Sequence, residues 1–210
     1  MKIDTFLKIG KSHKVCEDYI LSGTDPLSYI ILSDGCSSSE NTDMGARILC
    51  HLAKEYVQSR AKPILQKPLG IDILCDEMGS WIIYNAEQII KQLGLNKSCL
   101  DATLIVSIVC DFPTPTKDVI ATFVYGDGCI LEFGEDSFDF HEIMYTKNAP
   151  YYLSYKIDPQ RELMYEKLKI EKFLRGCFKN EVGISVKPMY RTEPYEDVYL
   201  HLTYPRDYNL

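Results

Sequence analysis

Residues 28–39 read Ser-Tyr-Ile-Ile-Leu-Ser-Asp-Gly-Cys-Ser-Ser-Ser, an apolar run that ends in Asp34-Gly35 and a serine-rich loop. A short, continuous run of apolar residues is typical of a strand that is buried on both faces. A glycine directly after the aspartate leaves a backbone carbonyl free to act as a ligand beside the carboxylate. The stretch therefore predicts a strand over 28–32 and a candidate ligand pair in Asp34 and Gly35.

Two amphipathic helices are predicted after this loop. The first spans about 42–60, and Thr42 or Asp43 can cap its start. The second spans about 72–93, where Gly94 ends it. Their apolar stripes consist of Ile48, Leu49, Leu52, Ala53, Tyr56 and Val57 in the first helix and of Leu74, Met78, Trp81, Ile82, Ile89 and Leu93 in the second.

The periodicity changes after residue 102, because β-branched and aromatic residues dominate 103–110, 119–125 and 129–133. These segments predict three strands of an antiparallel meander, with Gly126-Asp-Gly128 as its last turn. Residues 3–9 predict a further short strand. A strand, two helices and then a series of strands is typical of an α+β fold rather than an alternating βαβ fold.

The composition bounds the class of protein. The chain has 210 residues, of which 46% are hydrophobic and 25% charged, and this balance predicts a single soluble domain over 1–210. No apolar run approaches the roughly 20 residues that a membrane helix needs, and no apolar signal stretch follows the N-terminus, so we expect a cytoplasmic protein without membrane contact. The net charge of −7 argues against a nucleic-acid partner. Residues 161–175 have mixed periodicity and are predicted to form a helix.

The eight cysteines contain no Cys-x-x-Cys pair, which excludes zinc ribbons and thioredoxin-like sites. Cys50, Cys110 and Cys129 lie within apolar runs, where a reduced cysteine behaves as a small hydrophobic residue. We therefore expect buried free thiols in a reducing compartment.

Three acidic motifs lie at strand ends or turns: Glu17-Asp18, Asp34-Gly35 and Asp127-Gly128. Carboxylates at the ends of buried strands can converge, and hard oxygen ligands of this kind suit Mg²⁺ or Mn²⁺. Each motif is weak alone, because Asp-Gly is also a common hairpin turn, and for Asp127-Gly128 the turn is the favoured interpretation.

Order and spacing strengthen the metal interpretation, because the chain resembles the metal-dependent protein phosphatases of the protein phosphatase 2C (PPM) type, in a form similar to bacterial members. The matching elements occur in the family's order: Gly10-Lys-Ser-His-Lys-Val-Cys-Glu-Asp18, Ile31-Leu-Ser-Asp-Gly-Cys-Ser-Ser38, Gly45-Ala46, Asp101-Ala-Thr-Leu104 and Val124-Tyr-Gly-Asp-Gly128. The resemblance implies an αββα sandwich of two antiparallel sheets, with the two predicted helices together on one outer face.

The resemblance also implies roles for the acidic residues. Asp34 corresponds to the aspartate that bridges two metal ions, and Gly35 to the carbonyl ligand of one of them. Glu17 and Asp18 correspond to the acidic pair that holds that ion's water shell, and Asp127 to an aspartate that helps to hold an additional, weaker ion. The implied reaction is hydrolysis of a phosphomonoester by a metal-bridged water.

Two departures from the family pattern affect these expectations. Many members place a phosphate-binding arginine at the position of His13, so His13 is a candidate phosphate contact, although a lone histidine is more often structural. The family's later Asp-Gly and Asp-Asn motifs are not found, since Asp158 and Asp197 stand in other contexts. We therefore expect a C-terminally truncated chain that is nearly inactive by itself and tends to self-associate through exposed apolar edges.

Two functions follow. The first is a phosphatase that requires Mg²⁺ or Mn²⁺ and acts on phosphoserine or phosphothreonine in proteins. The second is a non-catalytic, phosphatase-like domain that binds a phosphoprotein partner. The sequence lacks the Gly-x-Ser-x-Gly, P-loop and Gly-x-Gly-x-x-Gly motifs of other enzyme classes.

Overall fold

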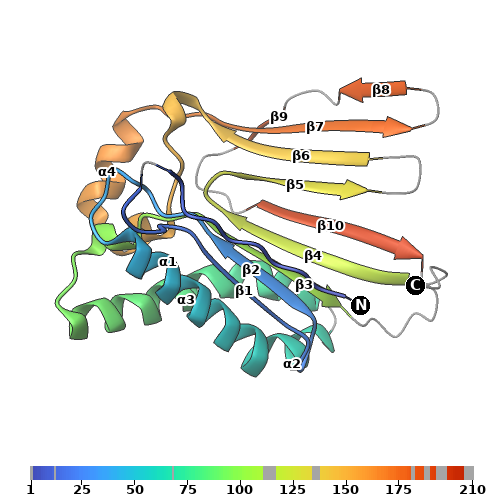
Figure 1. Cartoon of the computed structure of the whole chain (residues 1–210), viewed down its shortest axis with the longest axis horizontal. Coiled ribbons are helices and arrows are strands. Elements are labelled where there is room, and N and C mark those ends of the chain that lie inside the picture. The colour runs from blue at the N-terminus through green and yellow to red at the C-terminus, as the bar shows by residue number, and fades with distance from the viewer. Residues whose placement is uncertain are drawn as a thin grey trace.

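The computed structural model of the chain describes residues 2–11, 13–67, 69–110, 117–133, 138–180, 183–186, 190–192 and 198–205. Two β-sheets lie one above the other, and helices cover one face of the lower sheet (Figure 1). All strand pairs within the described residues are antiparallel. The predicted α+β class and two-sheet architecture are confirmed.

The first sheet has the strand order β1-β2-β3-β4-β10. Its strands are β1 (Tyr19–Gly23), β2 (Tyr29–Ser33), β3 (Leu104–Cys110), β4 (Lys117–Tyr125) and β10 (Val198–Pro205). The second sheet has the order β5-β6-β7-β8, and β9 also pairs with β7. Its strands are β5 (Gly128–Phe133), β6 (Phe138–Tyr145), β7 (Lys172–Asn180), β8 (Gly183–Val186) and β9 (Tyr190–Thr192).

Two long helices pack on the first sheet: α1 (Thr42–Tyr56) and α3 (Gly70–Leu93). A π-helical turn (Val57–Ala61) and the short helix α2 (Lys62–Leu65) connect them. Their apolar stripes and the facing side chains of β2, β3 and β4 form one buried cluster, because an amphipathic helix buries its apolar stripe against a sheet. The prediction that both helices lie on one outer face is therefore confirmed.

A smaller apolar cluster joins the two sheets. Val124 of β4 packs with Ile143 and Tyr145 of β6, and Ile105 of β3 borders the same cluster. Face-to-face packing of this kind is expected of a sandwich. The connection from β6 to β7 contributes Tyr151, Tyr165 and Ile170 and contains three helical segments: η3 (Thr146–Asn148), η4 (Leu153–Ile157) and α4 (Pro159–Lys167).

The predicted meander is wrong in its third strand. β3 and β4 pair as expected, but β5 pairs with β6 in the other sheet, and β4 pairs instead with β10. The Gly-Asp-Gly turn carries the chain from one sheet to the other instead of closing a hairpin, and Gly126 and Gly128 supply its positive φ angles.

Other predicted boundaries also need correction. Residues 3–9 form no strand, and Phe6 is 83% exposed, because this segment has no partner strand in the described chain. Neither Thr42 nor Asp43 caps α1, since Asn41 occupies that position in a left-handed conformation. The predicted helix over 161–175 ends at Lys167, and β7 begins five residues later.

The predicted end of the second helix is confirmed, whereas one of the predicted buried cysteines is exposed. Gly94 ends α3 with φ of 68°, as predicted. Cys50 and Cys110 are buried and form no disulfide, whereas Cys129 is exposed, because its side chain alternates to the outer face of β5. Residues 111–116, between the predicted strands 103–110 and 119–125, lie outside the described residues, as does Asp197. None of the helices in the described residues is long and apolar enough to span a membrane.

Candidate metal centre

Asp34 lies directly after β2, where the start of β3 holds its backbone. Its N–H donates a hydrogen bond to Thr103 Oγ1 (3.1 Å), and its carbonyl accepts one from the Thr103 N–H (2.9 Å). The Ser33 hydroxyl donates to the Thr103 carbonyl (2.6 Å). Three hydrogen bonds to Thr103, the residue directly before β3, therefore fix the position from which the Asp34 carboxylate projects.

Gly35 packs where no side chain fits. A Cβ at this position would lie 2.8 Å from the Glu17 carbonyl oxygen and 2.9 Å from the Thr42 Cβ. The Gly35 N–H donates to that same Glu17 carbonyl (3.2 Å). Gly35 also forms a β-bridge with Ala102, but hydrogen bonds of the flanking residues make this bridge, so it does not use the Gly35 carbonyl. The carbonyl remains a candidate ligand, as the sequence predicts.

The predicted acidic residues come together around Asp34. Partial burial raises the pKa of Asp34 to about 6, assisted by a hydrogen bond shared with Asp18 and by the negative charges of Asp18, Asp127 and Glu17. Asp34 is itself exposed to solvent, but the surrounding protein removes part of the water that would stabilise its charge. Burial also raises the pKa of Asp127. Carboxylates from three separate sequence motifs therefore lie close enough to Asp34 for their charges to act on it.

His13 lies beside the acidic pair. Its Nδ1 is 3.3 Å from Glu17 Oε2, and its side chain is exposed. Its backbone N–H donates to the Gly10 carbonyl (3.1 Å). Because Nδ1 faces Glu17, Nε2 is the ring nitrogen that remains to contact an anion. The structure therefore places His13 next to the carboxylate group but does not test its predicted role.

The donor set suits a hard divalent cation. The charges of three carboxylates repel the Asp34 carboxylate, and a bound cation would offset this repulsion. The buried Thr42 hydroxyl lies against Gly35 and has no hydrogen-bond partner among the described residues, so it could hold a water of such an ion. In the described part of the chain, no three His, Cys, Asp or Glu side chains are already close enough to hold a metal ion. A cation would therefore have to draw the carboxylates together.

Sequence reasoning missed residues that support this loop. Asp101 and Thr103 belong to the Asp101-Ala-Thr-Leu104 motif, but the sequence predicts no role for either residue. Partial burial by itself would raise the pKa of the Cys36 thiol. Hydrogen bonds with Ser38 and Tyr152 outweigh this effect and lower the pKa. The only signal in the sequence was the position of Cys36 directly after Asp34-Gly35, because Tyr152 lies more than a hundred residues away.

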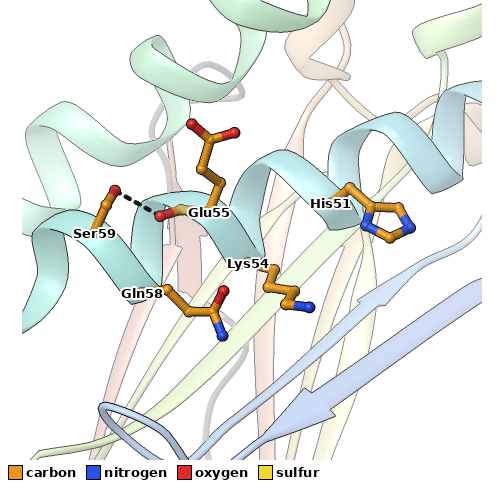
Figure 2. Close-up of a pocket in the computed structure, with 5 residues that line it drawn as sticks. All are labelled: His51, Lys54, Glu55, Gln58 and Ser59. Atoms are coloured by element: carbon orange, nitrogen blue, oxygen red, sulfur yellow. Dashed lines mark hydrogen bonds between the residues drawn. The ribbon is translucent and has the colours of Figure 1, made fainter.

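A surface groove along α1 lies apart from this centre (Figure 2). It has a volume of about 450 Å³ and is lined by His51, Lys54, Glu55, Gln58 and Ser59. Figure 2 shows Lys54 and Gln58 on one side of the helix and Glu55 on the other. The groove contains both signs of charge and none of the predicted site residues.

The model of one protein family, described as protein phosphatase 2C, matches residues 9–152 of this chain. The chain belongs to the protein phosphatase 2C family. No curated protein sequence matches the chain. The family match spans every predicted site residue and ends at Tyr152, within the connection between β6 and β7, the two central strands of the second sheet. Membership of the protein phosphatase 2C family supports a phosphatase-type, hydrolytic function.

The pKa of Asp34 predicts how metal affinity of this protein phosphatase 2C domain depends on pH. A ligand carboxylate must lose its proton to bind, so Mn²⁺ affinity should fall as the pH is lowered through about 6. Below that pH, the dissociation constant should rise roughly tenfold per pH unit for one displaced proton. Titration of the free Mn²⁺ signal by electron paramagnetic resonance measures this dependence. A dissociation constant that is constant down to about pH 5 would contradict the assignment of Asp34 as a ligand.

Proposed function

We propose that this protein is a phosphatase that requires Mg²⁺ or Mn²⁺ and hydrolyses phosphoserine or phosphothreonine in proteins. The observation that supports the proposal most strongly is the convergence of Asp34 with Asp18, Asp127 and Glu17 at one end of the first sheet. Family membership supplies the reaction class. We also propose that residues 1–210 act as one phosphatase-like domain.

Each residue has a definite part in this proposal. Asp34 and the Gly35 carbonyl would hold the cations directly, Glu17 and Asp18 would bind their water shell, and Asp127 would help to hold a further ion. Bound Mg²⁺ or Mn²⁺ supplies an activated water and neutralises charge on the transferring phosphoryl group.

Two features favour a phosphate group on a protein. The Asp34 carboxylate is exposed, so a phosphorylated side chain on a macromolecular surface can reach it without entering a deep pocket. His13 is also exposed at the same edge and can donate an N–H from Nε2 to a phosphate oxygen. A phosphate that arrives from solvent can therefore reach both the His13 N–H donor and a cation held by Asp34.

The proposal is tested by measuring phosphate release from a phosphothreonine peptide and from a simple aryl phosphate, with and without Mn²⁺. Turnover by residues 1–210 should be slow, because the assigned carboxylates make up only part of the ligand set that the family resemblance implies. What turnover there is should depend on Mn²⁺ and fall about a hundredfold or more in Asp34→Asn. Asp127→Asn should have a smaller effect of about tenfold, because this residue is assigned to a weaker ion.

His13→Gln provides a further comparison, because glutamine keeps a hydrogen-bond donor but not the ring. It should raise KM for the peptide more than it lowers kcat. Release of phosphate that is the same in Asp34→Asn as in the wild type would refute the proposal. A chain that binds the phosphopeptide but releases no phosphate would establish the non-catalytic binding function in its place.

A further inference from the structure

Asp101 is a buried carboxylate that the proposed chemistry does not use. It directly follows the 3₁₀ helix η2 (Lys97–Leu100), three residues before β3 begins, and only 3% of it is exposed. A buried carboxylate is costly unless several donors satisfy it. Its two oxygens accept three short hydrogen bonds, from Ser39 Oγ (2.7 Å), Ser154 Oγ (2.6 Å) and Arg161 Nη2 (2.7 Å).

These donors come from two segments that are far apart in the sequence. Ser39 lies in the loop of residues 34–39, which begins with Asp34-Gly35, whereas Ser154 and Arg161 lie in the connection between β6 and β7. The Asp101 carbonyl also accepts a hydrogen bond from the Cys36 N–H (2.8 Å). Asp101 therefore holds the loop at two points, Cys36 and Ser39, and links it to the connection between β6 and β7.

The residues after Asp101 continue this attachment to the candidate metal centre. Ala102 forms the bridge with Gly35, and Thr103 makes the hydrogen bonds that hold the Asp34 backbone. Any displacement of Asp101 is therefore transmitted within two residues to Asp34 and Gly35.

We propose that Asp101 is a positioning residue for the metal centre: paired with Arg161, it holds the loop of residues 34–39 so that Asp34 and Gly35 face the other carboxylates. The inference rests on the proposed function, since it assumes that these groups bind a divalent cation. Arg161 is itself held in place, because its guanidinium carbon lies 4.8 Å from the centre of the Tyr155 ring. Restraining ligands before the ion arrives raises affinity, because less order has to be created on binding.

Two serines allow a matched test. Ser39→Ala and Ser154→Ala each remove one hydroxyl from Asp101, so both should lower Tm slightly and leave the Arg161 ion pair intact. Only Ser39 belongs to the loop. We therefore expect Ser39→Ala to raise the Mn²⁺ dissociation constant about tenfold and Ser154→Ala to raise it no more than about twofold.

Arg161 tests the ion pair in the same way. Arg161→Met should raise the Mn²⁺ dissociation constant about tenfold or more, and Arg161→Lys, which keeps the charge, should recover most of the affinity. Lys91→Met is the control, because it removes a different ion pair, with Glu87 on α3, at 3.1 Å. It should leave Mn²⁺ affinity unchanged.

Affinity is measured by electron paramagnetic resonance of free Mn²⁺, at a temperature where circular dichroism shows every variant to be folded. Dissociation constants that stay at the wild-type value in Ser39→Ala and Arg161→Met, while Tm falls, would show that Asp101 is merely structural and would overturn the inference alone. A wild-type chain that binds no Mn²⁺ would overturn both the inference and the metal centre of the proposed function.

Discussion

Replacing Asp34 by asparagine should abolish measurable Mn²⁺ binding and, at the same time, make the metal-free protein more stable at neutral pH. The first effect follows because asparagine cannot supply the negative charge that a hard cation needs, and the dissociation constant should rise about a hundredfold or more. The second effect follows because the substitution removes the cost of partly burying the Asp34 charge and, in addition, the repulsion from Asp18, Asp127 and Glu17.

The sign of the stability change follows from the pKa. The pKa of Asp34 is about 6 in the folded protein, against an ordinary value of 3.8 for an aspartate. The folded state therefore holds the proton more strongly, so Asp34 stabilises the fold most below about pH 4, and this contribution is lost as the pH rises through about 6. Because Asp34 is exposed and screened, the loss is on the order of 1 kcal/mol, equivalent to roughly 2–4 °C in Tm.

Thermal unfolding in the presence of a chelator, between about pH 5 and pH 8, measures this effect. The wild type should lose stability across this range relative to Asp34→Asn. Asp72→Asn is the matched control, because Asp72 is an exposed aspartate in the first turn of α3. It should not change Mn²⁺ affinity and should slightly destabilise the helix. If Asp34→Asn were less stable than the wild type at neutral pH, the carboxylates would not repel one another as described.

Replacing Gly45 by alanine should destabilise the whole fold more than any of the other substitutions considered for this protein. A Cβ at Gly45 would lie 1.7 Å from the Cys99 carbonyl oxygen and 2.6 Å from the Cys99 carbonyl carbon. These are backbone atoms, and Cys99 and Leu100 are fully buried, so neither can move aside without opening the core. We expect a loss of about 3 kcal/mol or more, equivalent to roughly 6–12 °C in Tm.

The same substitution should also impair the metal centre, because Cys99 lies two residues before Asp101. Gly94→Ala is the matched control: Gly94 has a φ of 68°, but no atom lies within 4 Å of the added methyl group. It should cost only about 1 kcal/mol, from backbone strain alone. The free energy of unfolding in urea, measured for both variants, compares the cost of steric crowding at Gly45 with the cost of backbone strain at Gly94. A cost for Gly45→Ala no greater than that for Gly94→Ala would mean that α1 and η2 are not in close contact.

The sequence by itself determined the elements that depend on local periodicity. Helical spacing of apolar residues predicts α1 and α3, and Gly94 predicts the end of α3, because side chains three and four residues apart share one face of any helix. The β-branched runs predict β3 and β4 for a similar reason. The position of Asp34-Gly35 after an apolar run predicts the centre of the candidate site.

Only the tertiary structure decided which elements pair and what holds the site together. A strand needs a partner, and residues 3–9 form none despite their composition because no described strand pairs with them. β5 joins the second sheet although the turn before it resembles a hairpin. Asp101 illustrates the same limit for the site. Its three side-chain donors lie 62, 53 and 60 residues away, and no local pattern marks a carboxylate whose partners are gathered only when the sheets and helices pack.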